Sequence, residues 1–497
     1  MKRYLHSAAA VLLAAVIAVP VFAARGSADF SNFVALGDSY GAGFESSSLN
    51  ERHQPWSWPA VIARQAGLRL CTPSDTATSD CWAMPLVSFP GIANELLLQS
   101  IAPPSPVIAP APGQGQPLML TFGRPYNNLS IPGATVGALL GITGAEPPSP
   151  NEPTPVSFGR FILRGQGTAV QQAVAQHPTF IALWIGGNDY LNVLFSGDPA
   201  TLTPVTTFKA QYEAVLDALV AGAPNAGMVV GNLPTGVVPY LRLIPPVVVN
   251  PATGQPLLVD PATGLPSSTG VPLFYLAKTG EKDAQGNDIV APIASTTLIP
   301  LGTRTKLAQG YGLPPLFKNF PPFSLLPHTG EPLLASDVIT AEEYAATVAR
   351  VAEYNAVINA AAAARDIPVA DVAGLFNRVF SATGEHLGPI TVTAAPVTGG
   401  FFSYDFFHLT DLGYLLMGNE FIKAINAGYD TAIPLASITQ LFANNGAFFG
   451  DDGPGASANS MTFHGSNEGI TDEAVKKIVT MWAQPTVRKL RLRAISH

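Results

Sequence analysis

The stretch Phe33–Phe44, FVALGDSYGAGF, is the part of the sequence that says most about the fold. Its opening apolar run ends at Gly37, which is the pattern of a buried strand followed by a tight turn. Ser39 stands directly behind this predicted strand, where a hydroxyl is either a nucleophile or part of an ordinary turn. The rest of the chain has to distinguish these two interpretations.

Apolar runs and amphipathic segments alternate along the chain after this stretch. Such alternation predicts parallel βαβ units, and therefore an α/β fold in which helices cover both faces of a sheet. Sites in these sheets form where strand ends meet helix starts. The further predicted strands lie within 128–140, 179–190, 227–234 and 368–372, and the predicted helices within 56–67, 167–178, 206–224 and 341–367.

The segment 240–338 breaks this alternation. It is rich in Pro, Gly and Thr, and it repeats one short motif, NPATGQP at 250–256 and DPATGLP at 260–266. Two copies are too few for a solenoid, so we expect successive turns on an insertion. Its apolar pieces suggest packing over the core, as a lid or a wall of a substrate cleft. A loop that merely covers one end of the sheet is the other interpretation.

Residues 1–23 have the three parts of a secretory signal peptide: a basic start, an apolar run and small residues before a cleavage site. The apolar run is short of the roughly 20 residues that span a bilayer. We therefore predict cleavage after Ala23 and a secreted, periplasmic or cell-envelope protein with no transmembrane segment in the mature chain. In an oxidising compartment, Cys71 and Cys81 are expected to form a disulfide, and two free thiols are the alternative.

The composition of the 497 residues excludes several classes of protein. Hydrophobic residues make up 47% and charged residues 12%, so the chain can bury a large core and is not disordered. A net charge of −8 argues against a nucleic-acid partner. The predicted units are a main domain at 24–430, which contains the insertion, and a C-terminal extension at 431–497. The extension ends in a basic tail, which is either solvated or a peripheral contact for an anionic membrane surface.

Residues 37–41 literally spell G-x-S-x-G, the nucleophile elbow of α/β-hydrolases. That elbow follows several strands and helices, one of which supplies an upstream oxyanion loop. Only about 15 residues would precede Ser39 after cleavage of the signal peptide. The match is therefore interpreted as accidental.

A serine nucleophile needs a base, and the best candidate is His408 in FFSYDFFHLTDLGY. Asp405 lies three residues earlier, and on a helical turn such residues face the same way. Asp405 can then accept from one imidazole nitrogen while the other nitrogen faces Ser39. Asp38, directly before Ser39, is the other candidate for this acid, but it is better explained as a turn-forming residue whose side chain accepts hydrogen bonds from local backbone amides. The other histidines of the predicted mature chain lack an adjacent acid in a suggestive frame, apart from His386, which stands beside Glu385.

Four blocks occur in a fixed order: GDSY after the first strand, NLSIPGAT, GGND after a middle strand, and DFFH near the C-terminus. In this order the chain resembles the GDSL or SGNH hydrolase family, from about Asn32 to Ala427 with the insertion in between. The resemblance implies a three-layer α/β/α sandwich with a flavodoxin-like parallel sheet. Tyr40 stands at the position of the Leu in the Gly-Asp-Ser-Leu motif that gives the family its name, and this residue is not expected to take part in the reaction.

The same resemblance implies the roles of the site residues. Ser39 is the implied nucleophile, His408 the base and Asp405 the orienting acid. The implied oxyanion hole consists of the backbone N–H groups of Ser39 and Gly133 and the side-chain amide of Asn188. These residue types suit the roles, because glycine lets the backbone approach a bound carbonyl closely and an amide is a strong donor. No metal or cofactor is expected.

We therefore expect an exported serine esterase or lipase that hydrolyses carboxylic esters. The substrate is a small-molecule or lipid ester, and the apolar insertion favours acyl or lipid esters. A carbohydrate acetylesterase is the alternative within the same fold, and a non-catalytic exported binding or envelope module is the alternative of another class. The oligomeric state is not encoded in any of these patterns.

Overall fold

The computed structural model describes residues 24–100, 107–150, 152–196, 199–235, 239–250 and 253–443. The predicted signal peptide and the basic tail lie outside the described residues. Among the helices of these ranges, none has the length and apolar character of a membrane span.

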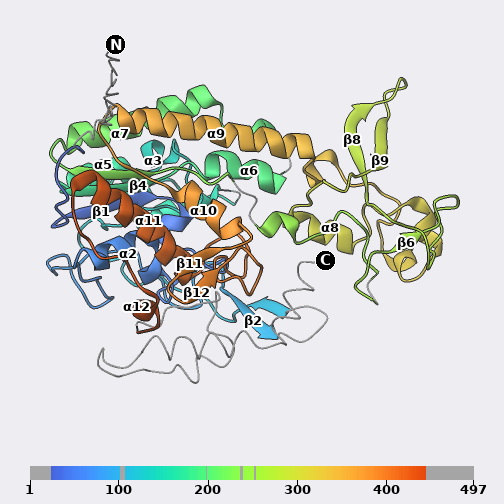
Figure 1. Ribbon diagram of the computed structural model, residues 1–497, viewed down its shortest axis with the longest axis horizontal. Helices are drawn as coiled ribbons and strands as arrows, with labels where there is room; N and C mark the ends of the chain where they lie inside the picture. The colour runs from blue at the N-terminus through green and yellow to red at the C-terminus, as the bar shows by residue number, and fades with distance from the viewer. Residues whose placement is uncertain are drawn as a thin grey trace, which may run out of the picture.

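A four-stranded parallel sheet forms the centre of the molecule (Figure 1). Its spatial order is β1 (Phe33–Gly37), β4 (Phe180–Trp184), β5 (Gly227–Gly231) and β10 (Val369–Ala370). Every residue of β1, β4 and β5 is buried. This burial accounts for their continuous apolar sequences, because a parallel sheet is covered on both faces.

The segment 127–131 extends the sheet beyond β1. The Ala35 N–H donates to the Asn127 carbonyl, and the Leu129 N–H donates to the Ala35 carbonyl. Because this segment comes second along the chain, the strand order becomes second, first, third, fourth, fifth, which is the flavodoxin-like order. The order reverses between β1 and β4, and ligands of such folds bind at the carboxyl ends of the strands at that point.

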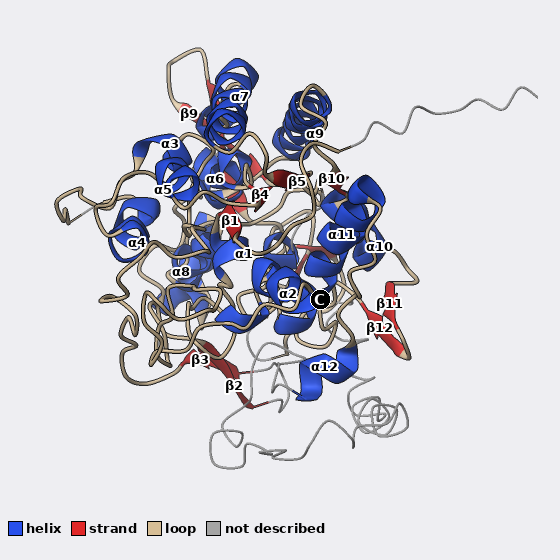
Figure 2. Ribbon diagram, turned by 90° about the vertical axis from the view of Figure 1, so that its left-hand side faces the viewer, coloured by secondary structure: helices blue, strands red, loops and turns tan. Residues whose placement is uncertain are grey.

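Helices form one layer on each face of the sheet (Figure 2). One layer contains α5 (Ala169–Ala175), α7 (Val205–Gly222) and α9 (Ala341–Ala363), and the other contains α2 (Trp58–Gln65) and α11 (Asp411–Tyr429). Capping boxes at Thr168 and Thr340 begin α5 and α9. The α/β fold predicted from the sequence is confirmed.

The remaining elements of the domain are short. The helices are α1 (Ser39–Ala42), α3 (Ala138–Gly141), α4 (Thr154–Leu163), α6 (Asn188–Ser196), α10 (Val372–Phe380) and α12 (Ile438–Ala443). Two antiparallel pairs lie outside the main sheet, β2 (Leu96–Ser100) with β3 (Val107–Pro110) and β11 (Glu385–Leu387) with β12 (Ile390–Val392).

The insertion 240–338 builds small cores of its own at one side of the molecule (Figure 1). It contains α8 (Arg304–Ala308) and two antiparallel pairs, β6 (Leu258–Val259) with β7 (Val271–Pro272) and β8 (Leu276–Lys282) with β9 (Asp288–Pro292). The sequence suggests a cover packed over the main core, whereas its buried apolar side chains lie mainly against each other. One cluster is Val248, Leu257, Val259, Leu313, Phe317 and Phe323, and the other is Ala277, Ile293, Ile299, Leu333 and Val338.

Cys71 and Cys81 form a disulfide, as predicted from the sequence. The loop that it closes is fixed to the sheet through the adjacent Trp82. This side chain is 2% exposed, and its indole N–H donates to the Phe33 carbonyl at 3.0 Å. The disulfide therefore closes a loop whose end is anchored on β1.

Candidate active site

Ser39 lies at the carboxyl end of β1, where the chain turns into α1. Asp38 caps this short helix, since its carboxylate accepts from the Tyr40 N–H at 3.0 Å. Burial raises the pKa of Asp38 to about 7. Asp38 therefore has the local, turn-forming contact expected of it, and Ser39 is presented at the sheet edge with 8% of its surface exposed.

His408 and Asp405 reach Ser39 from the loop that precedes α11. The Ser39 Oγ lies 3.0 Å from His408 Nε2, and His408 Nδ1 lies 2.7 Å from Asp405 Oδ2. A carboxylate accepts from Nδ1–H, which leaves the lone pair of Nε2 facing the serine hydroxyl. The structure thus brings the three sequence-predicted residues into one hydrogen-bonded chain.

The carboxylate of Asp405 is held in its ionised form. Burial favours the neutral acid, but the electrostatic attraction of the His408 ring, the hydrogen bond from that ring and the hydrogen bonds from the amides of Phe407 and His408 outweigh it. Together they lower the pKa of Asp405 to about 2. The Ser47 N–H donates to the same carboxylate at 2.7 Å, which links it to the loop that follows Ser39.

The loop around Asp405 is not the helical turn expected from the sequence. Asp405 and His408 lie in an irregular turn, and α11 begins only at Asp411. Phe406 has a left-handed conformation with φ of 59°, and Asp405 Oδ1 accepts from the amides of Phe407 and His408. These local hydrogen bonds, typical of an aspartate turn, bring the side chains at i and i+3 together.

The three predicted oxyanion donors lie on neighbouring segments. Gly133 has φ of 80°, and a Cβ there would lie 3.1 Å from the side chains of Thr154 and Pro155. Only glycine fits such a position without strain. The amide nitrogen of Asn188 donates to the Ala134 carbonyl at 2.9 Å, which fixes its orientation and leaves its second hydrogen for another acceptor. Among the described residues, the N–H groups of Ser39 and Gly133 have no hydrogen-bond partner.

Two buried side chains that the sequence analysis did not assign hold these segments in place. Asp189 accepts from the Val136 N–H and from the Thr203 hydroxyl, both at 3.0 Å, and so ties the segment after Gly133 to the start of α6. Asn128 donates to the Gly41 carbonyl at 2.8 Å. Both side chains are 1% exposed or less. Their only sequence signal is their position inside the conspicuous blocks GGND and NLSIPGAT.

A narrow pocket opens beside Ser39. Its walls are mostly aromatic or aliphatic, and no described residue of the insertion contributes to them. The lining residues are Asp38, Ser39, Tyr40, Trp184, Gly187, Tyr190, Leu191, Pro234, Phe376 and Phe407. Tyr40, which the sequence analysis placed outside the chemistry, lies beside the candidate catalytic loop. Its hydroxyl donates to the Phe407 carbonyl at 2.7 Å and so joins α1 to the loop that carries His408.

The chain was also compared with known proteins. No protein-family model and no curated protein matches it. Among solved structures, it is similar to a phospholipase A1 from Streptomyces albidoflavus, with 14% identity, a TM-score of 0.29, and coverage of 80% of this chain and 100% of that chain. It is also similar to an extracellular lipase from Streptomyces rimosus, with 15% identity, a TM-score of 0.30, and coverage of 79% and 99%. Both scores are low, so the fold and the candidate site rest on this chain's own strand order and geometry.

Proposed function

We propose that the protein is a serine hydrolase that cleaves carboxylic esters. The observation that carries this proposal is the hydrogen-bonded chain from Ser39 Oγ through His408 to Asp405, with contacts of 3.0 and 2.7 Å. A serine hydroxyl, an imidazole and a buried carboxylate in this order form the apparatus of acyl transfer.

The reaction proceeds in two halves. His408 Nε2 takes the proton of Ser39 as its Oγ attacks the ester carbonyl, and the carbonyl oxygen becomes an oxyanion. The C–O bond to the alcohol then breaks, and the alcohol leaves with the proton from His408. In the second half, water gives a proton to His408 and attacks the acyl carbon; the bond from that carbon to Ser39 Oγ then breaks, Oγ takes the proton back from His408, and the carboxylic acid leaves.

The oxyanion is stabilised by the N–H groups of Ser39 and Gly133 and by the Asn188 amide. These donors are fixed before the substrate arrives, by the turn at Gly133 and by the hydrogen bond from Asn188 to Ala134. Donors that need no reorganisation stabilise a developing charge most effectively, and removal of one typically costs about 10²–10³ in rate.

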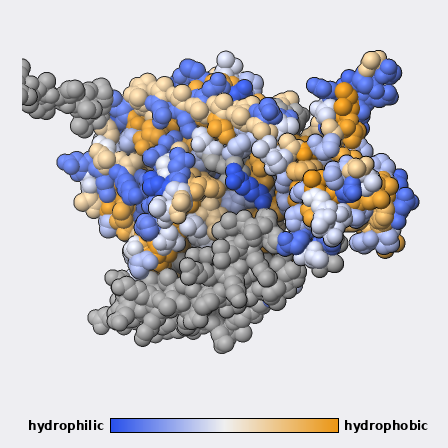
Figure 3. All heavy atoms as spheres, turned by 45° about the vertical axis from the view of Figure 1, so that its right-hand side comes forward, coloured by the Kyte–Doolittle hydropathy of each residue, from blue (hydrophilic) through white to orange (hydrophobic). Residues whose placement is uncertain are grey.

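Acyl or lipid esters are the substrates that the site favours. The pocket beside Ser39 is lined mainly by apolar and aromatic side chains, which suit an acyl chain better than a sugar. The insertion also presents apolar side chains to solvent on the lobe in Figure 3. Among the described residues, these large exposed side chains are Leu265, Val271, Val290, Leu316, Leu325 and Leu334. An exposed apolar surface of this kind suits contact with a lipid aggregate.

The protein acts outside the cytoplasm in this proposal. The disulfide between Cys71 and Cys81 suits an oxidising compartment, and residues 1–23 have the composition of an export signal.

An ester panel tests the function. Purified protein is assayed with p-nitrophenyl esters of increasing acyl length, with phospholipid and with acetylated xylan, and is labelled with a fluorophosphonate. Ser39→Ala is expected to lower kcat by roughly 10³-fold or more and to abolish labelling. The matched control, Ser381→Ala at an exposed serine, is expected to retain full activity. Full activity of Ser39→Ala would refute the mechanism, and cleavage of acetylated xylan alone would refute the substrate class.

A further inference from the structure

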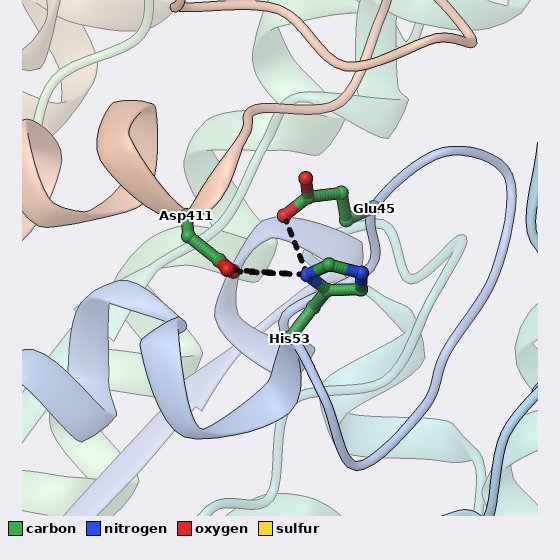
Figure 4. A group of neighbouring side chains, drawn as sticks. All are labelled: Glu45, His53 and Asp411. Atoms are coloured by element: carbon green, nitrogen blue, oxygen red, sulfur yellow. Dashed lines mark hydrogen bonds and ion pairs between the residues drawn. The ribbon is translucent and has the colours of Figure 1, made fainter. Parts of the chain in front are cut away.

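A second group of ionisable side chains lies buried beside the candidate active site. Glu45, His53 and Asp411 point toward one another in Figure 4, from the loop after α1, the turn that follows it and the first residue of α11. Glu95 lies on the other side of the same imidazole. All four side chains are 0–2% exposed. The proposed ester hydrolysis uses none of them.

Both ring nitrogens of His53 face carboxylates. Nε2 lies 3.0 Å from Glu95 Oε1, while Nδ1 lies 3.3 Å from Glu45 Oε2 and 3.2 Å from Asp411 Oδ1. A neutral imidazole carries one hydrogen. If Nε2–H donates to Glu95, the lone pair of Nδ1 faces two anionic side chains, an arrangement that is favourable when a cation, either a proton on Nδ1 or a metal ion, lies between them.

The net negative charge of the buried side chains also calls for a cation in the cluster. Three carboxylates are buried here, and Asp411 interacts electrostatically with the Arg64 guanidinium, while the His53 ring that contacts all three is a cation only when it is protonated. The fully buried Glu45 carboxylate lies beside His53 and Asp411, but neither of its oxygens makes a hydrogen bond of good geometry to the described residues. Buried carboxylates without partners are costly. A divalent ion together with Arg64 would balance the three negative charges.

The spacing of the three donor atoms fits a small metal ion. A four-coordinate zinc ion with ligand bonds of about 2.0 Å holds its ligand atoms about 3.3 Å apart. The separations of Nδ1 from the Glu45 and Asp411 oxygens are 3.3 and 3.2 Å, and the three atoms all lie within 4.8 Å of one another. We propose that Glu45, His53 and Asp411 bind a structural divalent transition-metal ion, with zinc as the best fit.

Glu95 completes the arrangement as the partner of a metal-bound histidine. Such histidines commonly donate their second ring N–H to a carboxylate, which fixes the ring and the tautomer. Glu95 is itself held, because Asn50 Nδ2 donates to Glu95 Oε2 at 3.0 Å. The imidazole ligand distinguishes the site from those of calcium and magnesium, which take oxygen ligands.

The ion would join the two loops that carry the reacting residues. Immediately after Glu45, the Ser46 N–H donates to the Ser403 hydroxyl at 2.9 Å and the Ser47 N–H donates to Asp405 Oδ2 at 2.7 Å. Asp411 follows His408 by three residues. Bound metal would therefore hold the 45–53 loop against the 403–411 loop, a structural role that does not depend on the ester chemistry.

Metal content and thermal unfolding test the proposal without any substrate. The full chain is purified, stripped with dipicolinate and titrated with Zn²⁺ alone. We expect one zinc per chain by elemental analysis and a rise in Tm of about 5 °C on saturation. X-ray absorption at the zinc edge is expected to show only nitrogen and oxygen ligands at about 2.0–2.1 Å.

Variants assign the metal to these residues. Glu45→Gln and Asp411→Asn are expected to lose the bound zinc and the rise in Tm, and Glu95→Gln is expected to weaken zinc binding roughly 10- to 100-fold. Glu420→Gln is the matched control, because Glu420 is a buried carboxylate that already pairs with Arg378 and Lys423. It is expected to bind zinc with unchanged stoichiometry.

Three results would overturn the proposal. They are the absence of a zinc-dependent rise in Tm of the stripped wild type, binding of zinc by Glu45→Gln as tight as that of the wild type, and sulfur ligands in the absorption spectrum. Should Glu45→Gln and Asp411→Asn both fail to fold, Glu95→Gln decides the matter, since unchanged zinc affinity in that variant also contradicts the site.

Discussion

Two aspartates near Ser39 have opposite electrostatic environments. Burial raises the pKa of Asp38 to about 7, although the carboxylate accepts a hydrogen bond from the Tyr40 amide. Asp405 is also buried, yet His408 and several amides that donate to it lower its pKa to about 2. At neutral pH, Asp405 is therefore the carboxylate suited to orient His408.

This difference predicts unequal effects of two amide substitutions. Asp405→Asn replaces the acceptor of His408 Nδ1–H and favours the wrong tautomer, so kcat is expected to fall by roughly 10²–10⁴-fold. Asp38→Asn keeps an oxygen that can accept from the Tyr40 amide, and its kcat is expected to fall by less than about 10-fold. Steady-state kinetics with a short p-nitrophenyl ester measures both. A larger loss in Asp38→Asn than in Asp405→Asn would mean that the acid has been misassigned.

Asp38 also predicts a dependence of stability on pH. Its pKa is 3.8 in the unfolded chain and about 7 in the folded protein, so the unfolded state binds fewer protons between these values. The free energy of unfolding therefore decreases as pH rises from about 4 to about 7, by up to about 4 kcal/mol from this group.

Urea unfolding of the wild type and Asp38→Asn at pH 4, 6 and 8 measures this effect. The variant has no charge to bury, so its stability relative to the wild type is expected to increase with pH. A difference between the two proteins that stays constant over this range would indicate an ordinary carboxyl group at Asp38.

At the scale of elements, the strand ends were predictable and the loops were not. Apolar runs such as Phe33–Gly37 identify buried strands because both faces of a parallel sheet are covered. The positions of Ser39 and Asn188 after β1 and β4 follow from the same pattern. The turn at Phe406 could not be predicted in this way, because its left-handed backbone conformation depends on hydrogen bonds to the side chain of Asp405. The contacts of His53 were also missed, since Glu45, Glu95 and Asp411 come from distant or irregular segments.

The loop closed by Cys71 and Cys81 gives a prediction at this scale. The sequence separation of 10 residues makes a short loop, and closing it is expected to contribute about 3 kcal/mol to the free energy of unfolding. Denaturant unfolding with and without reductant measures this contribution. The double variant Cys71→Ser/Cys81→Ser is the control, because reductant should leave its stability unchanged. Equal stability of oxidised and reduced wild type contradicts the prediction.

At the scale of the whole molecule, the insertion is a separate lobe with its own small clusters of buried side chains. Its β8–β9 hairpin is mostly exposed, whereas β1, β4 and β5 are wholly buried. Segments with few buried contacts open at a low free-energy cost. The hairpin is therefore the part of the described chain that we expect to open first.

Limited trypsin digestion is expected to cleave the hairpin at Lys282, which is 59% exposed, before the sheet is cut. The nicked protein should keep at least about half of its short-ester hydrolysis, because none of the insertion residues that the structure describes lines the pocket. Mass spectrometry locates the cut, and Lys282→Gln is the control in which cleavage at this position stops. If activity is lost in proportion to cleavage, the insertion is not independent of the candidate active site, and the prediction is wrong.

The distance in sequence between Ser39 and His408 has a consequence for biosynthesis. The two residues are 369 positions apart, and the base comes from the loop before one of the last helices. A nascent chain that has presented its serine thus has no imidazole to activate it until most of the protein has left the ribosome. Under the proposed function, the serine of the growing chain would therefore stay inactive towards esters until the 403–411 loop has been made and has folded against it.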